Sequence, residues 1–146
     1  MNTTNKQRGF TLIEVMVVVV ILGVLAALVV PQIMSRPDQA KITAAQSDIK
    51  ALALALDIYK LDNHAYPSSQ QGLAALVKKP SGTPAARNWN PDGYLKRIPL
   101  DPWGNPYQYQ LPTGHGGSFK LFSYGADGMA GGEGIQADIG NWTIQP

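Results

Sequence analysis

The chain has 146 residues, a formal net charge of +2 and no cysteine. Lys6 and Arg8 supply the whole charge excess, because the other 12 − 2 = 10 basic side chains are balanced by 10 acidic ones. A nucleic-acid-binding domain keeps a basic patch in its folded part, so the charge argues against that partner. The lack of cysteine rules out disulfides, and the domain must be stabilised by neighbours or a metal.

An unbroken apolar segment follows the basic N-terminal residues. No polar side chain occurs from Val15 to Val30, and a helix over residues 10–30 is about 30 Å long, the thickness of a bilayer core. Because basic residues stay on the cytoplasmic side, we expect residues 10–31 to cross the membrane and the rest to face outward. A plain anchor and an ordinary signal peptide are the alternatives, although Ala26-Ala27-Leu28 is a poor signal-peptidase site.

Glu14 is the one charged residue in this segment. A carboxylate inside a membrane-spanning helix costs about 3 kcal/mol by insertion scales and needs a partner, but no basic residue follows it within the run. The nearest possible cation is the α-amino group that cleavage before Phe10 would create. A protonated glutamic acid near the headgroups is the alternative.

The string Gly9-Phe10-Thr11-Leu12-Ile13-Glu14 resembles the cleavage and methylation motif of type IV pilins and pseudopilins. The resemblance implies that residues 1–9 are a leader, that a prepilin peptidase cuts after Gly9, and that the new amine on Phe10 is N-methylated. It also implies that Glu14 of one subunit pairs with the Phe10 amine of a neighbour during fibre assembly.

Small residues interrupt the bulky apolar run and suit close packing of helices in a fibre. They are Gly23, Ala26 and Ala27. Gly23 and Pro31 also weaken the helical hydrogen-bond ladder between them. By resemblance to related fibres, we expect this stretch to lose helicity after assembly.

A second helical pattern follows Arg36-Pro37, where Asp38 is a candidate N-cap. Apolar residues recur with spacings of three and four, which is typical of one face of an amphipathic helix ending near Asp62-Asn63. They are Ile42, Ala45, Ile49, Leu52, Leu56 and Tyr59. We expect this face to pack against the chain's own domain, with a coiled-coil partner as the alternative.

The next segment predicts a short second helix from Ser68 to Lys79. Its inward-facing residues would be Leu73, Leu76 and Val77. Residues 98–107 then hold three prolines and a glycine, which predicts consecutive turns anchored by Trp103.

Aromatic, alternating runs at 107–111 and 119–124 predict two strands joined by the glycine-rich loop 112–118. A short third strand is expected at 142–145. The predicted fold class is therefore α+β: a long N-terminal α-helix, with a hydrophobic transmembrane half and an amphipathic half, packed on a small antiparallel β-sheet.

Several strings in the second half resemble the major pseudopilins of type II secretion systems. They are Leu61 to Pro67, Gln71 to Leu73, Asp101 to Tyr107, Gly125 to Gly128 and Asp138 to Trp142. The resemblance implies a type IV pilin-like fold with residues 32–146 as a periplasmic globular domain. It implies an inner-membrane, single-pass subunit that polymerises into a periplasmic pseudopilus.

The implied function is the major structural subunit of a helical fibre that drives export of folded proteins across the outer membrane. The implied partners are further copies of the chain, minor pseudopilins, the inner-membrane assembly platform and the prepilin peptidase. A type IV pilin or a minor pseudopilin is the alternative within the same superfamily.

The stretch 125–140 is rich in glycine and carries three acids, Asp127, Glu133 and Asp138. Oxygen ligands on a flexible loop suit Ca²⁺, although the spacing is not that of an EF-hand and by itself favours a solvated loop. The resemblance implies one structural calcium ion held by Asp127 and Asp138, with Glu133 standing where relatives have further aspartates. Backbone carbonyls of three residues are expected to help: Leu121, Ser123 and Met129.

Catalytic motifs are absent from the sequence. There is no cysteine nucleophile, G-x-S-x-G, P-loop or HExxH, and His64 and His115 stand far apart in sequence. We expect a protein that is not an enzyme. A secreted calcium-dependent hydrolase, with a mature N-terminus near residue 30, is the alternative from another class.

Overall fold

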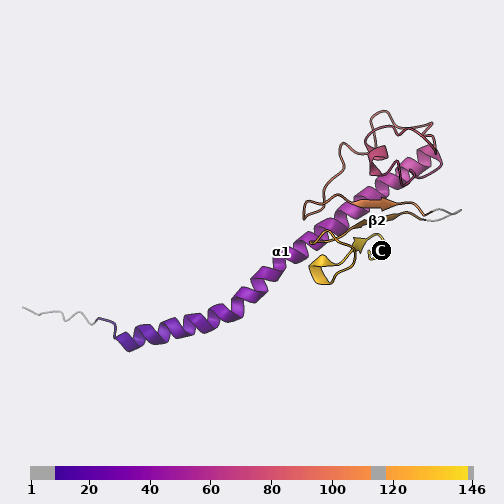
Figure 1. Cartoon of the computed structure of the whole chain (residues 1–146). Helices are drawn as coiled ribbons and strands as arrows, with labels where there is room; N and C mark the ends of the chain where they lie inside the picture. Colours follow the sequence, from indigo (N-terminus) through magenta and orange to yellow (C-terminus); the bar gives the residue numbers. More distant parts are fainter. Residues whose placement is uncertain (1–8, 113–117, 145–146) are drawn as a thin grey trace, which may run out of the picture. The chain divides into compact units, whose positions relative to one another are not determined.

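The computed structural model describes residues 9–112 and 118–144, with the side chains of residues 28–36 left out. Contacts divide the chain into two compact units, Met1–Pro37 and Asp38–Pro146. The helix α1 (Leu12–Asn63) begins in the first unit and ends in the second (Figure 1). The predicted leader residues 1–8, the loop residues 113–117 with His115, and Gln145 lie outside the described residues.

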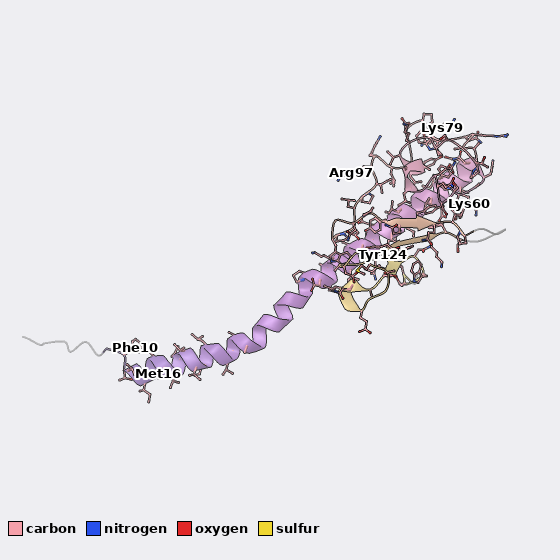
Figure 2. The ribbon with its side chains drawn as sticks, viewed as in Figure 1. Phe10, Met16, Lys60, Lys79, Arg97 and Tyr124 are labelled. Atoms are coloured by element: carbon pink, nitrogen blue, oxygen red, sulfur yellow. The ribbon has the colours of Figure 1, made fainter. Side chains whose placement is uncertain are left out.

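The first unit consists, where it is described, of the start of α1 and the three residues before it. Side chains from Phe10 to Ala27 are exposed, and Figure 2 shows Phe10 and Met16 at the start of the helix. Within the described part of the chain, no helical stretch combines the length and the apolarity that a membrane crossing requires.

The helix does not restart at Asp38. The prediction of a new helix capped by Asp38 is wrong, because α1 continues without interruption through Pro31 and Pro37. Proline's fixed φ angle is compatible with a helix, and each proline removes only its own N–H donor, at the cost of a local clash. The expected loss of helicity between Gly23 and Pro31 concerns the assembled fibre and stays a prediction.

The second unit is built on the predicted amphipathic face of α1, which is confirmed. Five of the six predicted residues are buried and Ile42 is half-buried. They form a core with side chains from the rest of the unit, including Leu76, Leu121 and Ile139. The helix ends at Asn63, as predicted, and His64 follows in the left-handed region with φ 61°.

A three-stranded antiparallel sheet lies alongside this part of α1 (Figure 1). Its order is β1 (Gln108–Gln110), β2 (Lys120–Ser123) and β3 (Ile139–Gly140). Tyr109 pairs with Leu121, and Ser123 pairs with Ile139. The predicted α+β class and the first two strands are confirmed, although both strands are shorter than expected.

The third strand was predicted in the wrong place. Residues 142–143 form a turn after β3, closed by a 3.0 Å hydrogen bond from the Thr143 amide to the Gly140 carbonyl. The turn allows the Trp142 ring to fold back over Gly140 and to lie 5.4 Å from the Phe122 ring. Packing of this aromatic side chain, rather than strand pairing, accounts for its presence.

The second helix was predicted too long. Only a 3₁₀ helix, η1 (Leu73–Leu76), forms between Ser68 and Lys79. Gly72 has φ 58° and ψ −164°, a conformation that no helix contains. The predicted inward residues Leu73 and Leu76 are buried and Val77 is half-buried.

The predicted turn segment is confirmed, and half-buried Trp103 packs against the core. Leu100 and Pro106 form an isolated antiparallel bridge at its base. A second 3₁₀ helix, η2 (Gly134–Gln136), lies in the glycine-rich loop before β3.

Candidate functional sites

The first candidate site is the junction between Gly9 and α1. Phe10 is 88% exposed and Gly9 is exposed beside it. Their peptide bond is therefore accessible in this chain, as a cleavage site requires.

Glu14 and Thr11 form a capping box at the start of α1. The Thr11 amide and hydroxyl donate to Glu14 Oε2 at 2.8 and 2.9 Å. The Glu14 amide lies 3.4 Å from the Thr11 hydroxyl oxygen. This reciprocal arrangement satisfies N–H groups that the first turn of a helix leaves without partners.

The capping box gives Glu14 a hydrogen-bonding partner within its own chain, Thr11, whereas only a cation was expected. The signal was present in the sequence, because Thr-x-x-Glu is the pattern of a capping box. Both Thr11 hydrogen bonds use the same carboxylate oxygen, Oε2, and within the described residues the other oxygen accepts no hydrogen bond. Glu14 can therefore cap its helix and bind a cation through Oε1 at the same time.

The second candidate site is the loop between β2 and β3, here called the acidic loop (residues 124–138). The Ala126 amide donates to the Ile135 carbonyl at 2.9 Å and closes the loop across its base. Gly125 makes this closure possible, because a Cβ there would lie 2.8 Å from the carbonyl oxygens of Ile135 and Ala137. Its φ of 73° also favours glycine.

The two predicted side-chain ligands, Asp127 and Asp138, both face this loop. Asp127 Oδ1 accepts from the Met129 amide and Asp138 Oδ1 accepts from the Gly131 amide, each at 3.1 Å. Within the described residues, the Oδ2 atom of each has no hydrogen bond. The two carboxylates thus bond to amides only two residues apart, and each keeps an oxygen available.

The other predicted ligands are less uniformly placed. The Leu121 carbonyl already accepts the Asn141 amide at 2.9 Å, which leaves it one lone pair. Ser123 is buried in β2, whereas Met129 and Glu133 are exposed. No group of three or more acidic or histidine side chains that could hold a metal occurs among the described residues.

The donors in the acidic loop fit a hard cation such as Ca²⁺ rather than a softer metal. Two carboxylates and several carbonyls are all oxygen ligands, which Ca²⁺ prefers. With two side chains, the remaining ligands would be backbone carbonyls and water. Gly128, Gly131 and Gly132 have positive φ angles, so the backbone can turn its carbonyls in ways that other residues resist.

Sequence reasoning missed Asp101, a buried carboxylate that is only 4% exposed. Its Oδ1 accepts from the Trp103 and Asn105 amides at 3.1 and 2.8 Å. Its Oδ2 accepts from the Ser123 hydroxyl at 2.6 Å. The signal available in the sequence was the aspartate opening a proline- and glycine-containing turn, which is typical of side-chain-to-backbone bonding.

A second carboxylate contact, which is partly buried, ties the residue before β1 to α1. The Tyr107 hydroxyl donates to Asp48 Oδ2 at 2.9 Å. Burial raises the pKa of Tyr107, and the hydrogen bond and charge of Asp48 raise it further, with a smaller contribution from Asp101. The phenol therefore stays protonated as a donor.

Two family models match the chain in separate parts. The model described as type II secretion system (T2SS), protein G matches residues 32–142. The model of the prokaryotic N-terminal methylation motif matches residues 4–30 and so includes the Gly9-Phe10 junction and Glu14.

Named relatives are similar over nearly the whole chain. The type II secretion system core protein G of Pseudomonas aeruginosa is 72% identical over 137 residues, covering 94% of this chain and 96% of the relative. The core protein G of Vibrio cholerae is 57% identical over 145 residues, covering 99% of this chain and 98% of the relative.

A solved structure agrees with the fold. The crystal structure of the major pseudopilin from the type 2 secretion system of enterohaemorrhagic Escherichia coli matches with a TM-score of 0.68 and 46% identity. The match covers 80% of this chain and 98% of that one.

Proposed function

The chain belongs to the type II secretion system protein G family, and we propose that it is the major structural subunit of a type II secretion pseudopilus. In this role it polymerises into a helical fibre that drives export of folded proteins across the outer membrane. It acts by assembly and not by catalysis. The observation that carries the proposal is the capped carboxylate of Glu14, four residues after Phe10, at the exposed start of an apolar helix.

Processing prepares this end of the chain for assembly. A prepilin peptidase cuts the exposed peptide bond after Gly9 and methylates the amine of Phe10. The match to the N-terminal methylation motif supports this step. Removal of the leader, which carries Lys6 and Arg8, leaves a single new positive charge at the tip of the segment.

Glu14 then sets the position of each new subunit. Its Oε2 remains bound to Thr11, and its Oε1 accepts the Phe10 ammonium of a neighbouring copy. Among apolar helices such a pair has little competition from water. Leaving one partner of a buried ion pair alone typically costs about 3–5 kcal/mol.

The surface of α1 supports packing among copies. All described large apolar side chains from Phe10 to Leu25 are at least 51% exposed. In the second unit, Leu54, Ile58 and Leu61 are 62, 44 and 75% exposed. Their spacing of four and three places them on one helical face, away from the buried residues Leu52, Leu56 and Tyr59. Repeated contacts that do not close a ring generate a helical filament.

Before assembly, the subunit resides in the bacterial inner membrane. The methylation motif and the family support an anchored N-terminal segment, residues 10–31, with the second unit in the periplasm. Its partners are the prepilin peptidase, the minor pseudopilins and the inner-membrane assembly platform, which are the components a pseudopilus subunit must meet.

One structural calcium ion completes the acidic loop. Asp127 and Asp138 hold it through carboxylate oxygens, and backbone carbonyls supply further ligands; Leu121, Ser123 and Met129 are the candidates. Glu133, the third acid of the loop, is exposed and is a further candidate ligand. The bound ion supplies positive charge that stabilises the closed loop by favouring the folded state. Because the chain has no cysteine, no disulfide can close this loop. The ion would therefore be the cross-link that holds the segment between β2 and β3.

A charge-only substitution tests the assembly role. Glu14→Gln keeps an acceptor for Thr11 and so preserves the cap, but it removes the negative charge. A matched control, Thr11→Val, removes the hydroxyl of the cap and keeps the charge. We expect Glu14→Gln to be cleaved normally and to lose fibres, measured by shearing and electron microscopy of cells that overproduce the subunit.

Thr11→Val should retain partial assembly, because Oε1 and its charge remain. The expected 3–5 kcal/mol corresponds to a loss of about 10²- to 10⁴-fold in subunit association. Normal fibre yield from Glu14→Gln, with cleavage intact, would contradict the pairing.

A further inference from the structure

The turn at residues 101–105 lies directly against the acidic loop, and its buried carboxylate reaches into the strand that opens the loop. Asp101 uses Oδ1 for its own turn, through the amides of Trp103 and Asn105. Its other oxygen leaves the turn and accepts from the Ser123 hydroxyl at 2.6 Å. A carboxylate needed only to close the turn would not require this second contact.

Ser123 passes the contact on to the loop. Its side chain is fully buried, and its hydroxyl oxygen accepts the Gly125 amide at 3.0 Å. A hydroxyl has one proton to donate. Because the Ser123 hydroxyl uses its proton in the hydrogen bond to Asp101, its oxygen lone pairs remain available to accept the Gly125 amide. The peptide that starts the loop is thus fixed by a buried chain of hydrogen bonds from Asp101.

The other end of the same turn lies beside the acidic loop at Gly128. The Asn105 side chain lies 3.5–3.6 Å from the position of a Cβ on Gly128. The turn therefore contacts the loop at Gly125, through Ser123, and at Gly128, through Asn105. These two contacts flank Asp127.

We propose that Asp101 is a positioning residue for calcium binding: it holds the acidic loop in the shape that presents Asp127, acting through Ser123 and supported by Asn105. The role assigned to Asp101 is to position the loop and not to bind the ion, because its Oδ1 accepts two amides of its own turn and its Oδ2 accepts the hydroxyl of buried Ser123. The inference rests on the proposed calcium site. In metal sites, removing the groups that orient the ligands lowers metal affinity about 10- to 100-fold.

The test compares Ser123→Ala with Tyr94→Phe in the full chain, solubilised in detergent. Ser123→Ala removes one oxygen atom and cuts the chain of hydrogen bonds between Asp101 and Gly125. Tyr94→Phe also removes a hydroxyl-to-carboxylate bond, the 2.9 Å bond to Asp62, at the far end of α1 from the acidic loop. It removes as well the two bonds that this hydroxyl accepts, from the Asn63 side chain and the Asn90 amide. Asp101→Asn is the second variant, which keeps the size of the side chain.

Two readouts are needed. The first is the melting temperature as a function of Ca²⁺ concentration, which gives the half-saturating concentration. The second is hydrogen exchange of peptides covering residues 124–131, measured with a chelator present. We expect Ser123→Ala and Asp101→Asn to raise the half-saturating concentration about 10- to 100-fold and to speed exchange in the loop. Tyr94→Phe should lower the melting temperature but leave both the half-saturating Ca²⁺ concentration and the hydrogen exchange of the loop unchanged.

The outcomes separate the two proposals. If the parent chain responds to Ca²⁺ and Ser123→Ala responds at the same concentration with unchanged loop exchange, the positioning role is wrong. If the parent chain shows no response to Ca²⁺, the calcium proposal is wrong and the role of Asp101 in metal binding falls with it. Faster loop exchange in Tyr94→Phe, equal to that of Ser123→Ala, would also overturn the inference.

Discussion

Gly125 offers a sharp test of how the acidic loop is closed. An alanine there places its Cβ 2.8 Å from two backbone carbonyl oxygens, those of Ile135 and Ala137, at φ 73°. Gly131 is a matched control, since it has φ 96° and nothing within 4 Å of the same position. Both substitutions carry the left-handed backbone cost, about 1–2 kcal/mol, and only Gly125→Ala adds a collision.

The collision sets the expected difference. Forcing extra atoms into a packed site typically costs about 1–3 kcal/mol, and backbone oxygens cannot rotate away as a side chain can. Gly125→Ala should therefore lower the free energy of unfolding by about 1–3 kcal/mol more than Gly131→Ala. The reduction in unfolded-chain entropy is the same for both substitutions and cancels in the comparison.

Denaturant unfolding followed by tryptophan fluorescence measures this difference. The three tryptophans all lie in the second unit, at positions 89, 103 and 142, so the signal reports the unit that contains the loop. The two variants are compared in detergent with a chelator present. Equal losses for Gly125→Ala and Gly131→Ala would refute the tight closure of the loop across Gly125.

Three further changes test other parts of the account. Tyr107→Phe removes a partly buried hydrogen bond to Asp48 and should cost about 1.5–3 kcal/mol in denaturant unfolding, more than Tyr66→Phe, whose bond to Asp57 is exposed; equal costs would contradict this. Burial, followed by Asp57, raises the pKa of Tyr66 from 10.0 to about 12. Its stabilisation should thus be complete below pH 10 and disappear as the pH rises through about 12, a loss that Tyr66→Phe removes from the stability profile. Finally, Leu54→Asp should keep the free energy of unfolding within about 0.5 kcal/mol of the parent and yet reduce the fibre yield. Lys120→Asp on β2, the control, should leave the fibre yield unchanged.

The sequence was most informative where one physical requirement dominates. The spacing of apolar residues from Ile42 to Tyr59 predicted the buried face of α1, because a helix can bury only one such stripe. The end of that helix at Asn63 and the positions of the first two strands followed from similar patterns. Each of these features depends on a pattern of side chains within one short segment of the sequence.

The errors arose where a local rule met a competing one. Pro37 was taken as a helix break, but the helix tolerates the loss of one donor. Trp142 was assigned to a short third strand, but its ring packs over Gly140 instead. Ser68 to Lys79 was assigned to a helix, and the single conformation of Gly72 prevents it.

The candidate sites were predicted unevenly for the same reason. Phe10 and Glu14 are recognisable because the motif is contiguous, and the cap by Thr11 could have been read from the same letters. Asp101 could not be linked to the acidic loop from sequence, because its contact with Ser123 joins residues 22 positions apart. The calcium ligands stay a prediction.

The central claim is that the chain is trimmed before Phe10 so that a new amine can meet the carboxylate of Glu14. Intact-mass and N-terminal fragment spectra of subunits recovered from sheared fibres test it most directly. The account predicts a chain of residues 10–146 carrying one methyl group on the Phe10 nitrogen. A mature chain that begins near residue 30, or at any residue other than Phe10, would contradict it.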